Sequence, residues 1–246
     1  MINTILLDLD GTLLHFRQDE FISAYFTELK KVFIHLGFDT ELTVKGLWAG
    51  IKAMVQNSGE RLNSDCFWEE FSRVMGLTNK QVISIESACR DFYSGDEFDS
   101  VKSILKNTDP ELPQKIVRSA TEMGFTVVLA TNPLFPECAV TTRLSWIGLS
   151  VSDFKLVTHY ENSTFCKPDP GYYLEIFRKI GKEPRECLMV GNSTLEDMSV
   201  GKLDTDTFLV NEYIENESEM DISKFQSGTL MEFWKYMKNM EPPVYV

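Results

Sequence analysis

ILLDLDGT, at residues 5–12, is the stretch that decides the fold of this chain of 246 residues. Its first three residues are apolar and predict a short buried strand, and the polar residues after them predict a turn. Two carboxylates that lie so close together beside a buried strand end repel each other, so Asp8 and Asp10 need a cation or a shared proton. Mg²⁺ suits this need because it prefers oxygen ligands. Since open parallel sheets bind ligands at the carboxyl ends of their strands, Asp8 and Asp10 mark a candidate site.

The rest of the chain alternates between short apolar runs and helical patterns. Further strands are expected at residues 125–130, 156–158, 187–190 and 207–210. Helices, each ended by a glycine, are expected at residues 112–123, 136–147, 171–180 and 194–200. A last amphipathic helix is expected at residues 229–240. This alternation predicts an α/β fold, with a doubly wound parallel sheet and helices on both faces.

Residues 16–92 differ because their apolar residues recur at helical spacing with no strand pattern between them. We predict that these residues form an all-helical cap, called the helical insertion below, and that residues 1–15 and 93–246 form the α/β core. Hinges are expected near residues 14–17 and 94–99. The helices of the insertion are expected at residues 21–36, 48–55, 67–74 and 82–92. Five of its aromatic residues are expected mainly to pack these helices together, with one or two of them lining the cleft at the candidate site: Phe21, Tyr25, Trp48, Phe67 and Trp68.

Composition argues against several classes of protein. The chain has 24 Lys and Arg against 37 Asp and Glu, a formal net charge of −13, which disfavours a broad nucleic-acid-binding face. The sequence contains no apolar run long enough to predict a membrane span, and its start lacks the basic region of a signal peptide. The five cysteines are odd in number and widely spaced, which favours reduced thiols and a cytoplasmic location. The acidic residues 212–221 are expected to form a solvated loop.

Four motifs, in order, resemble those of the haloacid dehalogenase-like hydrolases. Residues 5–14 resemble the first motif, and Thr131 closes an apolar run as the second motif does. Lys167, in the sequence CKPDP, is similar to the third, and GNSTLED at residues 191–197 is similar to the fourth. The matches span residues 5–197, essentially the whole predicted core. The helical insertion directly after the first motif resembles the C1-type cap of this family.

The resemblance implies a phosphatase that acts on a small phosphate monoester, a phosphorylated metabolite. Asp8 would attack phosphorus and form an aspartyl-phosphate, and Asp10 would be the general acid and base. Thr131 and the backbone N–H of Asn132 would bind the phosphoryl oxygens, and Lys167 would neutralise the charge of the nucleophile and of the transferred group. These roles have a physical reason, because phosphoryl transfer depends mostly on positioning and charge neutralisation.

The resemblance also implies a Mg²⁺ site. Asp8, the backbone carbonyl of Asp10, and Asp197 would hold the ion. Family members usually carry Asp at the position of Asn192, and Asn can offer an oxygen ligand but removes one negative charge. We therefore expect weaker metal binding at Asn192, or a shift of that role to Asp197 and Glu196.

Three alternatives accompany this interpretation. A phosphomutase of the same superfamily keeps all four motifs, and a catalytically weak or silent binding or regulatory protein is favoured by Asn192. A dehalogenase is disfavoured, because such enzymes do not use an acid at the position of Asp10. His15, just after the first motif, is expected either to face the substrate or to make a structural hydrogen bond. Oligomeric state is left open.

Overall fold

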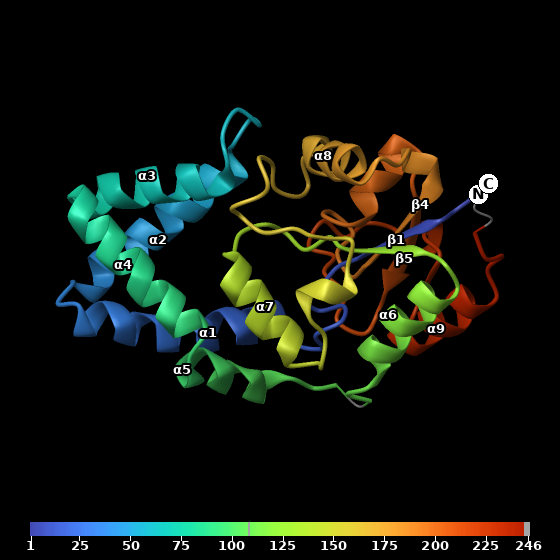
Figure 1. Cartoon of the computed structure of the whole chain (residues 1–246), viewed down its shortest axis with the longest axis horizontal. Helices are drawn as coiled ribbons and strands as arrows, with labels where there is room; N and C mark the ends of the chain where they lie inside the picture. Colours follow the sequence, from blue (N-terminus) through green and yellow to red (C-terminus); the bar gives the residue numbers. More distant parts are fainter. Residues whose placement is uncertain (108, 244–246) are drawn as a thin grey trace.

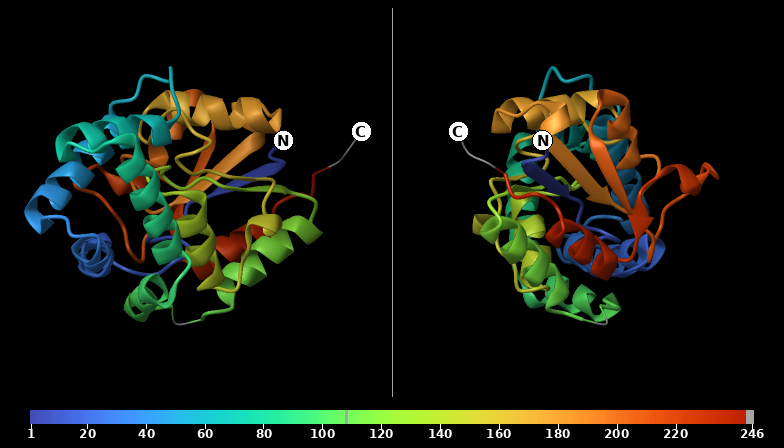
Figure 2. Two further views of the ribbon diagram at one scale, coloured as in Figure 1. Left: turned by 60° about the vertical axis from the view of Figure 1, so that its left-hand side comes forward. Right: turned by 90° about the vertical axis from the view of Figure 1, so that its right-hand side faces the viewer.

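A single parallel sheet forms the centre of the computed structural model, which describes residues 1–107 and 109–243. Within these residues the sheet has six strands in the order β3-β2-β1-β4-β5-β6. Figures 1 and 2 show this sheet with helices on both sides. The strands are β1 (Thr4–Leu7), β2 (Thr126–Leu129), β3 (Leu156–Val157), β4 (Cys187–Gly191), β5 (Asp206–Val210) and β6 (Ser227–Gly228). The predicted doubly wound α/β fold is confirmed, and the first strand lies inside the sheet.

Strand β1 lies between β2 and β4, which come much later in the chain. Leu7 pairs with Leu129 of β2 and with Val190 of β4, so the three strands end at the same edge of the sheet. Chain order changes direction around β1, and such a switch point is where open parallel sheets bind ligands. The pairing therefore brings the residues after these three strands together at one place.

Both faces of the sheet are covered, which explains why β1 and β4 read as continuous apolar runs. Successive side chains point to opposite faces: Ile5 and Leu7 belong to a different buried cluster from Leu6. One face packs against α6 (Leu112–Glu122), α7 (Glu137–Ser145) and α9 (Leu230–Lys238). The other face packs against α8 (Pro170–Ile180), which lies on the opposite side in Figure 1.

The helical insertion forms four long helices beside the carboxyl edge of the sheet (Figure 1). They are α1 (Gln18–His35), α2 (Thr40–Val55), α3 (Asn63–Met75) and α4 (Asn79–Tyr93), followed by the short α5 (Asp96–Asp99). Within the described residues no strand lies between β1 and β2, as expected. Buried apolar contacts run from α1 into the core without a break, since Phe21 and Leu129 belong to one cluster. The division into two domains at residues 15/16 and 92/93 stays a prediction.

One predicted helix is wrong. Residues 194–197 form turns, and a 3₁₀ helix at Met198–Leu203 replaces the α-helix expected at 194–200. The Asp197 side chain accepts a hydrogen bond from the Ser193 N–H at 2.9 Å, and the Ser193 hydroxyl accepts one from the Glu196 N–H at 3.1 Å. The Asp197 N–H makes the α-helical bond to the Ser193 carbonyl at 3.0 Å, but the Met198 N–H donates to the same carbonyl and the Val200 N–H to the Asp197 carbonyl. The spacing of the backbone bonds therefore changes, and the segment does not continue as an α-helix.

The same segment ends later than predicted. Gly201 lies inside the 3₁₀ helix, and Asp204 ends it with a left-handed φ of 62°. Strand β6, two residues long, has no apolar pattern and was not predicted. In the part of the chain that the structure describes, no helix has both the length and the apolar character needed to cross a membrane.

Candidate active site

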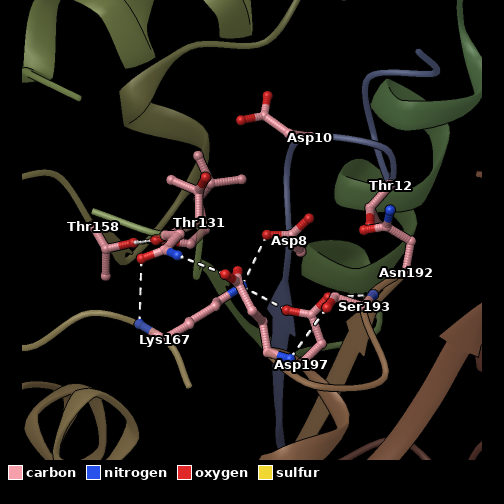
Figure 3. A network of polar contacts seen from close by, with 12 residues as sticks. Asp8, Asp10, Thr12, Thr131, Thr158, Lys167, Asn192, Ser193 and Asp197 are labelled. Carbon is pink, nitrogen blue, oxygen red and sulfur yellow. Dashed lines mark hydrogen bonds and ion pairs between the residues drawn. The ribbon is translucent and has the colours of Figure 1, made fainter. Parts of the chain in front are cut away.

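Asp8, Lys167 and Asp197 form a buried cluster of charges at the end of β1 (Figure 3). The Lys167 ammonium donates to Asp8 Oδ1 at 2.9 Å and to Asp197 Oδ1 at 2.6 Å. The Asp8 N–H donates to the Val190 carbonyl at 2.9 Å and so continues the ladder between β1 and β4. The fold thus joins the first, third and fourth motifs, although Lys167 lies 159 residues after Asp8.

Burial governs the electrostatics of this cluster. Burial raises the pKa of the Asp8 carboxyl well above its usual range; Lys167 opposes this shift and Asp197 adds to it. Burial also acts to lower the pKa of the Lys167 ammonium, but Asp197 and Asp8 outweigh it and hold that pKa above its usual range. Lys167 therefore stays charged. One ammonium faces two buried carboxylates, so the ionised cluster has a surplus negative charge that a cation would balance.

Thr131 and Asn132 follow β2, and Figure 3 shows Thr131 beside the same cluster. The Thr131 carbonyl accepts hydrogen bonds from the Thr158 hydroxyl at 2.6 Å and the Tyr172 hydroxyl at 2.8 Å. The Lys167 N–H donates to Asn132 Oδ1 at 3.2 Å. These bonds hold the turn after β2 in place beside the backbone of Lys167.

Glu196 points toward this turn. Its carboxylate accepts from Asn132 Nδ2 at 3.0 Å, and burial raises the pKa of Glu196 to about 7. The side chain is therefore engaged with Asn132, and the suggested metal role of Glu196 stays a prediction.

Asp10 is held by an arginine that the sequence analysis missed. Arg143 Nη1 donates to Asp10 Oδ2 at 2.5 Å, and the Arg143 side chain is fully buried. In Figure 3 the Asp10 carboxylate points away from Asp8. Asp10 Oδ1 and Arg143 Nη2 are both buried and have no hydrogen-bond partner among the described residues. Asp10 thus has one oxygen fixed and the other free for a ligand.

A signal for Arg143 was present in the sequence. The residue lies on α7 at the same helical face as Ala139, Val140 and Leu144, all of which are buried. An arginine in an apolar stripe is buried with its helix face, and a buried charge needs a partner. The sequence could indicate that need, but it could not name Asp10, which precedes Arg143 by 133 residues.

Asn192 is turned toward Thr12 of the first motif rather than toward Asp8 (Figure 3). Its Oδ1 accepts from the Thr12 hydroxyl at 3.1 Å, and its Nδ2 donates to the Tyr213 carbonyl at 2.6 Å. Gly11 has a φ of 75°, and a Cβ added there would lie 2.3 Å from Asn192 Nδ2, so the turn requires glycine. The amide connects three loops, and the metal role of Asn192 stays a prediction.

The acidic segment is not a fully solvated loop, which corrects the expectation for its first part. The Glu215 N–H donates to the Asn192 carbonyl at 2.9 Å, and the Glu215 carbonyl accepts from the Thr194 N–H at 2.9 Å. Burial raises the pKa of Glu215 to about 7. The segment therefore packs against the fourth motif, a contact that its charge alone gave no reason to expect.

His15 contacts this segment. The His15 ring is buried and lies 5.4 Å from the Tyr213 ring, with Nε2 3.8 Å from Glu212 Oε2. Burial lowers the pKa of His15, and Glu212 opposes that shift. The His15 side chain therefore packs against the acidic segment.

The donors at this site suit Mg²⁺. Among the residues that the structure describes, no three His, Cys, Asp or Glu side chains form a group that could hold a metal. The Asp8 and Asp197 carboxylates and the Asp10 carbonyl supply oxygen atoms only. Mg²⁺ accepts such a set because it keeps several water ligands and needs few protein carboxylates.

A model of the haloacid dehalogenase-like hydrolase family matches residues 2–203, so this chain belongs to that family and is a hydrolytic enzyme. No curated protein matches its sequence.

Solved structures agree on the fold. A HAD phosphatase from Thermococcus onnurineus is 17% identical, with a TM-score of 0.57, over 98% of this chain and 100% of that one. A predicted phosphoglycolate phosphatase from Haemophilus somnus 129PT is 14% identical, with a TM-score of 0.55, over 96% and 97%. The putative HAD-hydrolase YfnB from Bacillus subtilis, bound to magnesium, is 19% identical, with a TM-score of 0.53, over 97% and 99%. At such identities the likeness concerns the fold.

Proposed function

We propose that this enzyme is a Mg²⁺-dependent phosphatase that hydrolyses a small phosphate monoester through an aspartyl-phosphate on Asp8. The observation that carries the proposal is the contact between Asp8 and the buried Lys167 at the end of the central strand. The names of two structural neighbours, both described as phosphatases, support the reaction class. The bound magnesium of a third supports the metal.

The arrangement of the side chains suits a two-step reaction. Lys167 fixes Asp8 Oδ1 and leaves Oδ2 to attack phosphorus. As the Asp8–phosphorus bond forms, the bond from phosphorus to the alcohol oxygen breaks, and Asp10 gives its proton to that oxygen. Asp10 then takes a proton from a water molecule whose oxygen attacks phosphorus, which releases inorganic phosphate and restores Asp8. Asp10 Oδ1, the oxygen not held by Arg143, would make both transfers.

The turn after β2 would bind the phosphoryl group. The Thr131 hydroxyl and the Asn132 N–H would donate to its oxygens, while Lys167 balances their charge. Asp8, Asp197 and the Asp10 carbonyl would hold Mg²⁺. The ion would neutralise the negative charges of the nucleophile and of the phosphate. A contribution from Asn192 Oδ1 would require the amide to release Thr12.

Hydrolysis of p-nitrophenyl phosphate tests this proposal. The wild type should release phosphate with Mg²⁺ and lose that activity in EDTA. Asp8→Asn should lower kcat by about a thousandfold or more, because it removes the nucleophile. Asp19→Asn is the matched control, since Asp19 is exposed and pairs only with Arg17 among the described residues. Acid-quenched enzyme should carry covalent phosphate on the peptide that contains Asp8.

Two outcomes would favour the alternatives. Equal inactivity of the wild type and Asp8→Asn across a broad panel of phosphate esters would favour a silent binding or regulatory protein, the interpretation suggested by Asn192. Phosphoryl transfer to a sugar phosphate without release of phosphate would favour a phosphomutase.

Cellular location is also a proposal. All five cysteines are free thiols, and two of them, Cys166 and Cys187, are buried. Free thiols fit a reducing compartment, so we propose a cytoplasmic enzyme that acts on a phosphorylated metabolite.

A further inference from the structure

An apolar cavity of about 130 Å³ lies between the helical insertion and the turn that follows Asn132. Its walls come from α1, α2, α3 and α4 and, on the core side, from residues 134–136 and Tyr160. Among the lining residues that the structure describes, none is Asp, Glu, Lys, Arg or His. All five aromatic residues expected to pack the insertion line this cavity: Phe21, Tyr25, Trp48, Phe67 and Trp68.

Several polar side chains in these walls are hydrogen-bonded to one another. The Tyr25 and Tyr93 hydroxyls share a hydrogen bond of 2.6 Å, and Trp68 Nε1 donates to the Tyr160 hydroxyl at 3.3 Å. A sugar or a charged group placed here would lose its hydrogen bonds to water and find few replacements, which is costly. The cavity therefore suits an uncharged apolar occupant.

The cavity adjoins the residues that would handle the leaving group. Leu134 and Phe135, which line it, lie two and three residues after Asn132 in the chain. The Arg143 guanidinium lies 4.3 Å from the Phe135 ring and holds Asp10. Phe135, a wall of the cavity, thus packs against the arginine that holds Asp10.

We propose that this cavity binds the alcohol part of the substrate, and that the substrate is the phosphate monoester of an uncharged, apolar alcohol. This inference rests on the proposed phosphatase function and narrows its substrate class. An apolar cavity of roughly 150 Å³ holds one benzene molecule, so the present one suits about six carbon atoms. It also argues against a phosphomutase, because a second phosphate would meet no cation in these walls.

A series of n-alkyl phosphates from ethyl to octyl tests the inference, with glycerol 3-phosphate as the polar comparison. The alcohols of the series differ little in acidity, so changes in kcat/KM report binding of the chain. With saturating Mg²⁺, kcat/KM should rise by up to about fourfold per CH₂, the value expected for burial of a methylene. The rise should level off at about six carbons, when the cavity is full. Glycerol 3-phosphate should be a poorer substrate than butyl phosphate.

Two variants in α1 test whether the dependence of kcat/KM on chain length arises in this cavity. Ile22 lines the cavity and is partly exposed, whereas Ile34 is exposed on the same helix. Ile22→Trp should fill the cavity and move the best chain length to shorter esters. Ile34→Trp should keep the wild-type profile.

Failures of the two proposals can be told apart. A flat chain-length profile, or an unchanged profile in Ile22→Trp, together with good hydrolysis of ethyl phosphate, overturns the cavity assignment and keeps the phosphatase. If no ester is hydrolysed, calorimetric titration with hexylphosphonate and ethylphosphonate decides. If the wild type binds hexylphosphonate more tightly than ethylphosphonate, and Ile22→Trp loses this preference, the apolar site is supported and the phosphatase reaction is rejected. Equal binding of the two phosphonates rejects the apolar site.

Discussion

Asp10 and Arg143 form the pair that defines this site at the scale of single residues. The arginine is fully buried and the aspartate is partly exposed, so the protein keeps a desolvated positive charge beside its predicted general acid. Such a charge is tolerated only when it is paired. The guanidinium holds one carboxylate oxygen and leaves the other without a partner among the described residues. We therefore propose that Arg143 is a positioning residue, which would orient Asp10 for proton transfer.

Replacing Arg143 by Met should affect substrates unequally. Hydrolysis of hexyl phosphate, whose alkoxide needs a proton to leave, should lose about a hundredfold in kcat. p-Nitrophenyl phosphate, whose leaving group is stable without a proton, should lose much less. Arg143→Lys keeps the charge and should recover part of the activity on hexyl phosphate. Equal losses on both substrates, with normal circular dichroism, would mean that Arg143 is only structural.

At the scale of elements, the start of α3 is bonded to the loop that precedes Lys167. The first N–H groups of a helix lack partners within the helix. Here the Asn63 N–H donates to the Ser163 carbonyl at 2.9 Å, and the Ser64 N–H donates to the Tyr160 carbonyl at 3.0 Å. Asn63 Nδ2 also donates to the Phe165 carbonyl at 3.2 Å. The helical insertion is thus joined by hydrogen bonds to a loop of the predicted core.

We expect Asn63→Ala to lower the free energy of unfolding by about 1–3 kcal/mol, because Asn63 is fully buried and its bonded carbonyls would lose a partner. Asn79 is the matched control: it begins α4 as Asn63 begins α3, but it is exposed. Asn79→Ala should change stability by no more than about 0.5 kcal/mol. Urea unfolding of both variants measures the difference, and equal losses would contradict the role given to Asn63.

At the scale of the whole molecule, charge balance connects ligand binding to stability. The site lies where three strands end and combines the buried Asp8, Lys167 and Asp197. Burying two carboxylates against one ammonium is costly, and a bound cation relieves that cost only in the folded protein. Ligands of the site should therefore stabilise the complete fold.

Mg²⁺ together with orthophosphate should raise the melting temperature. At a hundred times the dissociation constant, a ligand adds about 2.7 kcal/mol, or about 5–10 °C for a chain of this size. Phosphate without Mg²⁺ should give a smaller shift. Differential scanning fluorimetry of the wild type and Asp8→Ala provides the measurement. A shift of the same size in Asp8→Ala would place the ligands elsewhere.

Patterns among neighbouring residues predicted most of the fold and most residues of the candidate site. An apolar run followed by acids predicts a buried strand with a polar end because both features belong to neighbouring residues. The same holds for the strand before Thr131 and for the loop that contains Lys167. Local reasoning failed at residues 194–200, where the Asp197 N–H makes an α-helical bond to the Ser193 carbonyl but the chain then continues as a 3₁₀ helix.

The sequence by itself determined the parallel sheet, the helical insertion and the residues that meet where the central strands end. Only the tertiary structure decided that Arg143 holds Asp10, that Asn192 faces Thr12, and that Glu215 packs on the fourth motif. It also decided that the aromatic residues of the insertion enclose a cavity. The reason is physical: strand and helix patterns depend on near neighbours, whereas the partner of a buried polar group depends on which distant segments pack against it.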